Sequence, residues 1–226
     1  MEITSFVKKI KKKLFNFRDK NGLFFTKTRV FGANNRIIRD RGCRISNLQI
    51  KIFGDNNIIH IGRGTKIENM KIDIRSNGGS VTIGESCRMF DLHFMVEGPK
   101  GGKISIGRGA YCRGGNFSVY DSFDIEVGDD CLLAHGLDVM TGDAHSIIDL
   151  ETQKRMNKHK SIKIHNHVWI CAKVAILKGV EIGSNSIVGL GSVVAKSIPP
   201  DSLAVGVPAK VIKKNISWDE DRTMTD

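Results

Sequence analysis

Residues 164–198 read IHNHVWICAKVAILKGVEIGSNSIVGLGSVVAKSI, and this stretch decides the fold. An aliphatic residue recurs every six positions, at Ile164, Ile170, Ile176, Ile182, Val188 and Val194. Four positions after each of these comes a second inward candidate: Val168, Val174, Val180, Ser186, Ser192 and Ile198. This period describes a short strand and a turn, and three such sides close one coil. Because one coil cannot bury its inner face, coils must stack by parallel strand pairing, so the sequence predicts a parallel β-helix.

The repeat continues upstream with a longer period. Residues 32–52 (GANNRIIRDRGCRISNLQIKI) align without a gap on residues 54–74 (GDNNIIHIGRGTKIENMKIDI), with 10 identities in 21 positions. We interpret the offset of 22 as the same three-sided coil with longer corners. A small residue recurs at one phase of these coils, at Thr65, Cys87, Ala110, Cys131 and Ser186. Cys87 and Cys131 are therefore expected to fill small inward positions, where a free thiol behaves as a small hydrophobe.

Composition narrows the class of protein. The chain has 226 residues, 40% of them hydrophobic and 26% charged, which excludes a disordered, collagenous or membrane-spanning chain. Its 5 cysteines are odd in number and contain no CxxC pair, so a disulfide framework is not expected. The N-terminus lacks the apolar core and cleavage site of a secretory signal, and we expect a cytoplasmic protein. The formal charge of +11 fits nucleic acid, membrane or acidic ligands without choosing among them.

We divide the chain into three parts: residues 1–22, 23–198 and 199–226. In the first part, Phe6, Ile10, Leu14 and Phe17 have helical spacing, and residues 1–20 carry seven Lys and Arg against Glu2 and Asp19, or +5. Two interpretations of this basic amphipathic helix stay open: a cap on the first coil, or peripheral binding to an anionic membrane. The second part is the β-helix, interrupted by an extruded loop near residues 141–161. The third part leaves the repeat at Pro199-Pro200 and forms a short tail or helix.

Three segments resemble the left-handed β-helix acyltransferases, hexapeptide-repeat enzymes that use acetyl-CoA. They are MTGDAHSI around His145, HVWI with ILKGVEIGSNSIVGLGSVVAKSIPP, and SLAVGVPAKVIKKNISW. The upstream coils resemble those of capsule and lipopolysaccharide O-acetyltransferases. The resemblance implies a left-handed coil and a homotrimer with active sites between subunits. It also implies acetyl-CoA as acyl donor, with no metal expected.

The resemblance also assigns residues. His145 corresponds to the catalytic base, and an imidazole suits removal of a hydroxyl proton at neutral pH. Asp143 or Asp149 is a candidate to orient it. Trp169, predicted to point outward, corresponds to a residue that lines the cofactor and acceptor channel, and Asn116 to one that contacts acceptor hydroxyls. The positions corresponding to cofactor contacts are Ala172, Leu190, Ala195, Lys196, Lys210 and Lys213. The last two replace Arg, which keeps the charge but loses bidentate geometry.

The function that follows is acetyl-CoA-dependent O-acetylation of a sugar in a bacterial surface polysaccharide or its precursor. One alternative is N-acetylation of an amino sugar or acetylation of an antibiotic. Another is a zinc-dependent β-helix enzyme of the carbonic anhydrase type, suggested by His165 and His167 on one strand face with His159 and Cys171 nearby. The last alternative is a non-catalytic scaffold. Nucleic-acid binding is not expected, because the basic residues after the N-terminal helix lack interleaved aromatics in the sequence.

Overall fold

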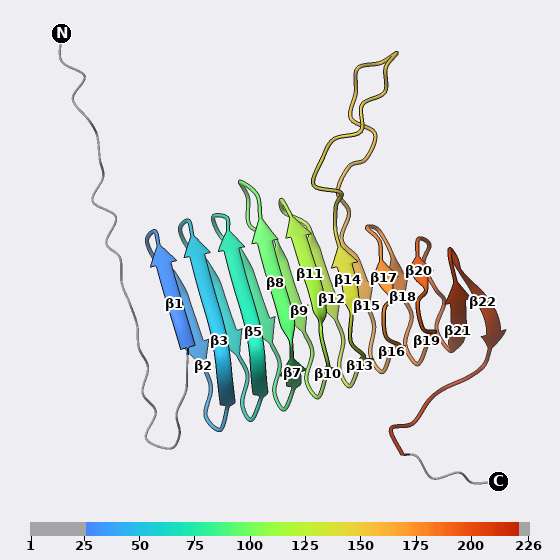
Figure 1. Ribbon diagram of the computed structural model, residues 1–226, viewed down its shortest axis with the longest axis horizontal. Helices are drawn as coiled ribbons and strands as arrows, with labels where there is room; N and C mark the ends of the chain where they lie inside the picture. The colour runs from blue at the N-terminus through green and yellow to red at the C-terminus, as the bar shows by residue number, and fades with distance from the viewer. Residues whose placement is uncertain (1–25, 222–226) are drawn as a thin grey trace.

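The computed structural model describes residues 26–221, and they form a parallel β-solenoid, which confirms the predicted all-β class (Figure 1). Its coils have three sides. Side one holds parts of β3 (Arg44–Phe53) and β5 (Lys66–Arg75) and the strands β1 (Thr26–Phe31), β8 (Leu92–Glu97), β11 (Gly115–Tyr120), β14 (Leu137–Met140), β17 (Ala175–Ile176) and β20 (Val193–Val194). Side two holds β2 (Arg36–Arg39), β4 (Ile58–Ile61), β6 (Ser80–Ile83), β9 (Lys103–Ile106), β12 (Asp124–Val127), β15 (Ile162–Ile164) and β18 (Glu181–Ile182).

Side three begins with the first residues of β3 and β5. It continues through β7 (Arg88–Phe90), β10 (Tyr111–Cys112), β13 (Leu132–Leu133), β16 (Trp169–Ile170), β19 (Ile187–Val188) and β21 (Ser202–Gly206). Every pair of strands on the three sides is parallel, as the repeat predicts. The last strand, β22 (Ala209–Lys214), instead folds back antiparallel on β21. The tail after Pro200 therefore starts as a β-hairpin whose first strand extends side three, rather than as a helix.

The core is a continuous column of inward side chains. The residues that set the six-residue period, from Ile164 to Val194, are at most 1% exposed. Cys87 and Cys131 are 1% exposed, which confirms their assignment to small inward positions, and all five cysteines are free thiols. Phe94 and Phe117 pack against each other within the column, with ring centroids 5.0 Å apart and planes tilted by 59°. These side chains are buried only when neighbouring coils stack on both sides, so each coil of the solenoid is stabilised by its contacts with the next.

The two periods of the sequence have a structural explanation. Lys66 pairs with Arg88 in the early coils, an offset of 22, whereas Trp169 pairs with Ile187 in the late coils, an offset of 18. The early coils are longer partly because their strands on side one are longer: β8 spans 6 residues and β17 spans 2. The corner between sides one and two is not longer, contrary to the expectation from the sequence: it spans residues 76–79 between β5 and β6 and residues 177–180 between β17 and β18. Buried Asn57 fills that corner, where its side chain bonds Asn35 and the amide of Gly79.

At the start of the corner between sides two and three, several successive coils have a glycine because no larger residue fits there. A Cβ on Gly107 would lie 2.5 Å from the backbone carbonyl carbon of Gly128 in the next coil. His165 breaks this glycine row, and its side chain turns toward Glu181 on the following coil instead. The row explains why Ile-Gly and Val-Gly pairs recur in the sequence.

Residues 141–161 leave the solenoid between β14 and β15 and project from its body, so the predicted extruded loop is confirmed (Figure 1). The predicted N-terminal helix lies outside the described residues. Among residues 26–221 we find no helix long and apolar enough to cross a membrane.

Candidate active site

The loop that carries His145 is anchored where it leaves the solenoid. The amide of Lys160 donates to the carbonyl of Thr141 at 2.9 Å, which closes the base of the loop. Thr141 is fully buried, and its hydroxyl accepts a hydrogen bond from the amide of Tyr120 at 2.9 Å. The loop therefore starts from a fixed point at the end of β14.

Asn157 organises the loop around His145. Its Nδ2 donates to the carbonyl of His145 at 2.8 Å and to Oδ2 of Asp143 at 2.6 Å. Its Oδ1 accepts from the amide of Ile147 at 2.7 Å. Asn157 is 8% exposed, whereas His145 is exposed. The loop thus fixes the backbone of His145 from below and presents its imidazole to solvent, where a reactant can reach it.

The two aspartates considered as orienting partners have other roles. Asp143 bonds Lys178, which comes from the corner between β17 and β18, and the pKa of its carboxyl is lowered, chiefly by that hydrogen bond. Asp149 accepts from the amides of Thr152 and Glu151 at 2.7 and 3.0 Å, and these bonds lower its pKa. Asp143 therefore ties the loop to the solenoid, and Asp149 caps a turn at the loop tip.

A second histidine, His159, lies beneath the loop and is buried. Its ring stacks on Tyr120 with centroids 5.6 Å apart, and its Nε2 lies 3.1 Å from Nη2 of Arg155. A Cβ on Gly142 would fall 1.8 Å from Nδ1 of His159, so only glycine fits there. This packing of His159 was not predicted from the sequence, where His159 appears only in the zinc alternative; Gly142, just before Asp143, was the available signal.

Trp169 lies on side three, away from the strand that leads to His145. It points outward from β16, is half-buried, and pairs in register with Leu132 and Ile187. The loop of His145 follows β14 on side one. A single chain therefore presents these two candidate residues on different sides of the coil.

Asn116 lies on side one, on β11 next to β14. It is exposed, and its Nδ2 donates to Oδ1 of Asp138 on β14 at 2.9 Å. The structure therefore brings Asn116 to the side that carries His145 and adds Asp138, which the sequence analysis did not single out.

The candidate cofactor residues lie along the last coils. Ala172 and Leu190 occupy successive levels of the corner after side three, where the amide of Gly191 bonds the carbonyl of Ala172 at 3.0 Å. Leu190 is 71% exposed. Ala195 and Lys196 follow β20 and are exposed, and Lys210 and Lys213 are exposed on β22. The candidate cofactor residues are therefore spread over the corner after side three, the corner after side one, and β22. The three lysines among them are exposed, and phosphates could accept charge-assisted hydrogen bonds from them.

Side three also carries a row of cationic and aromatic side chains that the sequence did not reveal. The guanidinium carbon of Arg88 lies 4.1 Å from the ring centroid of Tyr111, and Nη1 of Arg113 donates to the Tyr111 hydroxyl at 3.1 Å. Lys66 lies 5.0 Å from the ring centroid of Phe90. These residues, Lys66, Arg88, Phe90, Tyr111 and Arg113, lead along the solenoid toward Trp169, and we call them the cationic–aromatic row.

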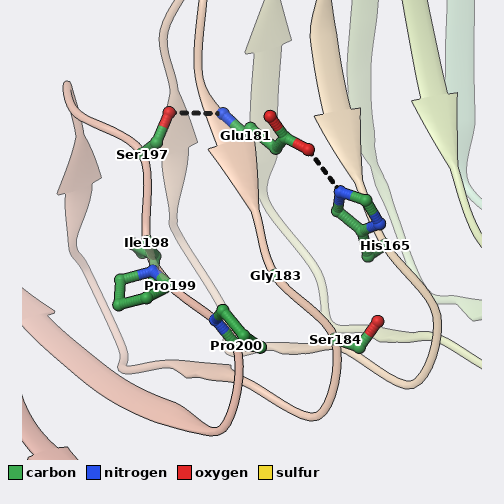
Figure 2. Close-up of a pocket in the computed structure, with 8 residues that line it drawn as sticks. All are labelled: His165, Glu181, Gly183, Ser184, Ser197, Ile198, Pro199 and Pro200. Atoms are coloured by element: carbon green, nitrogen blue, oxygen red, sulfur yellow. Dashed lines mark hydrogen bonds and ion pairs between the residues drawn. The ribbon is translucent and has the colours of Figure 1, made fainter.

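A pocket of about 510 Å³ lies elsewhere, at the corner between sides two and three near the end of the solenoid (Figure 2). His165 Nε2 and Glu181 Oε1 lie 2.5 Å apart at its rim, and this contact with His165 lowers the pKa of Glu181. Its other lining residues are Gly183, Ser184, Ser197, Ile198, Pro199 and Pro200. None of the residues considered for acetyl transfer lines it, and His165 is the residue of the zinc alternative that does.

Comparison with known proteins identifies the family. Residues 161–196 match the bacterial transferase hexapeptide model, which describes six repeats. The solved structure of the polysialic acid O-acetyltransferase OatWY has a TM-score of 0.82 to this chain at 31% identity, covering 86% of this chain and 92% of that one. The chain belongs to the hexapeptide-repeat acyltransferases.

Two further members of the hexapeptide-repeat acyltransferases are similar over part of their length. The polysialic acid O-acetyltransferase of Escherichia coli O1:K1 / APEC is 35% identical over 119 residues, which are 53% of this chain and 39% of that protein. The galactoside O-acetyltransferase of Escherichia coli (strain K12) is 38% identical over 116 residues, 50% of this chain and 55% of that protein. The chain thus spans about half or less of these two relatives.

Within residues 26–221 no group of three or more His, Cys, Asp or Glu side chains could hold a metal ion.

Proposed function

We propose that the protein is an acetyl-CoA-dependent O-acetyltransferase that acts on a sugar hydroxyl of a bacterial surface polysaccharide or its precursor. The observation that carries the proposal is the His145 loop, in which Asn157 fixes the backbone while the imidazole stays exposed. Family membership supports it, and the relatives named above are O-acetyltransferases.

In the proposed mechanism, His145 acts as general base. Its neutral imidazole accepts the hydroxyl proton while the sugar oxygen bonds to the acetyl carbon of acetyl-CoA. When the carbon–sulfur bond breaks, the imidazolium returns that proton to the departing CoA thiolate. The products are the O-acetyl sugar and CoA. Trp169, Ala172, Leu190, Ala195 and Lys196 are proposed to hold the acyl donor, with Lys210 and Lys213 near its phosphates.

We propose a homotrimer of left-handed coils, as the family resemblance implies, and the arrangement of the two sides supports sites that are shared between subunits. His145 and Trp169 lie on different sides of one chain, so a site that contains both would take one residue from each of two copies. Closed symmetric assemblies repeat such a shared site at each interface. Asn116, with Asp138 beside it, would then contact the acceptor hydroxyls near His145.

The cationic–aromatic row supports an acidic acceptor. Guanidinium groups pair with carboxylates, and aromatic faces pack on the apolar faces of sugar rings. The row leads toward Trp169 on side three. Two of the relatives named above act on polysialic acid, by their names, and polysialic acid is an acidic polymer.

The test measures release of the CoA thiol from acetyl-CoA with a panel of acidic and neutral capsular oligosaccharides, amino sugars and antibiotics. We expect turnover above hydrolysis with a saccharide that offers a hydroxyl, and loss of about 10²–10⁴-fold in kcat for His145→Ala. Turnover only with amines, and a mild effect of His145→Ala, would support the N-acetylation alternative instead. If no acceptor in the panel supports turnover, the transferase function is wrong.

A further inference from the structure

The segment that follows β22 returns across side three of the solenoid (Figure 1). We call residues 215–221 the strap. The amide of Ile216 donates to the carbonyl of Asp201 at 3.1 Å, and the carboxylate of Glu220 lies 3.6 Å from the guanidinium of Arg88. Between these two contacts the strap passes the coil of His167. It therefore runs backward along the solenoid and crosses several coils that precede it in the sequence.

Trp218 is the central contact of the strap. Its indole N–H donates to the carbonyl of His167 at 2.9 Å, and its ring stacks on the His167 imidazole with centroids 4.3 Å apart and planes 7° apart. That imidazole is itself held, because its Nδ1 lies 3.2 Å from Oδ1 of Asn185, and Asn185 donates in turn to Asp201 at 2.8 Å. Trp218 thus rests on a ring whose orientation is fixed by a ladder of side chains.

Trp218 also contacts the candidate channel residue. Its ring centroid lies 6.0 Å from that of Trp169, with an interplanar angle of 51°, within the range of favourable aromatic pairs. Along the solenoid axis, Leu132 and Ile187 flank Trp169 on either side. Trp218 covers the side of Trp169 that faces His167, which lies in the corner just before β16. The remaining side faces the next corner, where the candidate cofactor residue Ala172 lies.

We infer that Trp218 is a positioning residue, which holds the Trp169 indole in the orientation that the proposed acyl-transfer site uses. This inference rests on the proposed function for the role of Trp169. A bulky indole on a strand surface has several accessible rotamers, and each rotamer that Trp218 removes lowers the entropy cost of presenting Trp169 to the reactants. The strap is then part of the site and not only a covering of the solenoid surface.

The first experiment tests the geometry without turnover. The protein has only 2 tryptophans, so Trp218→Phe and Trp218→Ala each leave Trp169 as the sole indole. We expect the wild type to show an exciton couplet of paired indoles in far-ultraviolet circular dichroism, and both variants to lose it. We also expect acrylamide to quench Trp169 fluorescence several-fold more readily in Trp218→Ala than in Trp218→Phe. Equal quenching in the two variants would mean that Trp218 does not confine Trp169.

The second experiment tests the consequence for the reaction. We expect Trp218→Ala to lower kcat/KM by about 10–100-fold, as misplacement of a site residue does, and Trp218→Phe to restore most of it. Ser217→Ala is the matched control, because it changes an exposed strap residue next to Trp218 and leaves the indole in place. A melting temperature measured for each variant separates misfolding from mispositioning. If Trp218→Ala matches Ser217→Ala in kcat/KM, the inference is wrong.

The two experiments also separate this inference from the proposed function. If the wild type turns over no acceptor, the proposed function fails, while the couplet and the quenching still decide whether Trp218 holds Trp169. If the wild type is active and Trp218→Ala is equally active, the proposed function stands and the positioning role fails.

Discussion

Single residues decide how the catalytic candidate is presented. His145 makes backbone contacts to Asp143 and Asn157, but its exposed imidazole depends on the loop for its position. Asn157 is suited to this task because an amide both donates and accepts, and the loop uses both functions. A buried amide that loses its partners is costly, so the loop conformation and the Asn157 contacts support each other.

Asn157→Ala should therefore lower activity without greatly lowering stability. It removes the donors to His145 and Asp143 and the acceptor for Ile147, so the loop loses its fixed conformation. We expect kcat to fall about 10–100-fold while the KM for acetyl-CoA changes little. Lys154→Ala, at an exposed position in the same loop, is the control and should behave as wild type. Equal kcat values for the two variants would contradict the positioning role of Asn157.

The cysteines should differ sharply in reactivity. Burial raises the pKa of the Cys112 thiol to about 12 and that of Cys131 to about 11. Cys43 and Cys87 are also buried with raised pKa values. Burial raises the pKa of Cys171 too, but this thiol is only half-buried, so a reagent can reach it. Because the thiolate is the reactive form, we expect Cys171 to react first with a disulfide reagent at pH 8 and the others only after denaturation. Cys171→Ser should abolish the fast phase; fast reaction at any remaining cysteine of that variant would contradict the buried column.

At the scale of elements, the link between the loop and the solenoid is the Asp143–Lys178 ion pair. The pKa of Asp143 is lowered, so its carboxylate stabilises the docked loop above the ordinary carboxyl pKa of about 3.9 and loses this effect as the pH falls through its own lower value. The Asp143 side chain is 44% exposed, so the pair contributes at most about 1 kcal/mol.

Lys178→Met should loosen the loop at neutral pH. Amide hydrogen exchange of residues 143–157 is expected to speed up a few-fold in this variant, in line with a loss of about 1 kcal/mol or less, while exchange in β17 stays as in the wild type. At a pH well below the folded pKa of Asp143, both proteins should exchange alike in the loop, because the carboxyl is then protonated. A difference that persists at that pH would show that Lys178 acts through something other than Asp143.

The strands themselves illustrate what periodicity predicts and what it leaves open. The six-residue period identified the inward residues of β15 to β20 because side-chain direction follows from local spacing. The tail after Pro200 was not predictable in the same way. Its strand β21 pairs with β19 and its strand β22 folds back, and both arrangements depend on partners elsewhere in the chain.

At the scale of the whole molecule, the separation of His145 and Trp169 makes the assembly part of the proposed site. We expect a trimer by light scattering. We also expect complementation when His145→Ala and Trp169→Ala chains are co-expressed, because one interface can pair an intact His145 with an intact Trp169. With random mixing, a quarter of the interfaces carry both residues, so activity should reach about one quarter of wild type. Activity no greater than that of the separate variants would contradict a site shared between subunits.

The sequence by itself determined the repeating fold, the column of inward residues, the loop near residues 141–161 and the family resemblance around His145. Each of these depends on spacing within one coil or on a local motif, which a chain displays directly. The tertiary structure decided the contacts of Asn157 and Lys178 below His145, the cationic–aromatic row, and the approach of Trp218 to Trp169.

The physical reason is the register between coils. Paired residues lie 22 positions apart at Lys66 and Arg88, 37 apart at Leu132 and Trp169, and 18 apart at Trp169 and Ile187. Because this offset changes from coil to coil, the sequence does not show which outward side chains become neighbours. The basic residues that lack interleaved aromatics along the chain acquire them across the coils, where Arg88 stacks on Tyr111. Stacking of the coils, and not the order of residues, therefore builds the surface of the site.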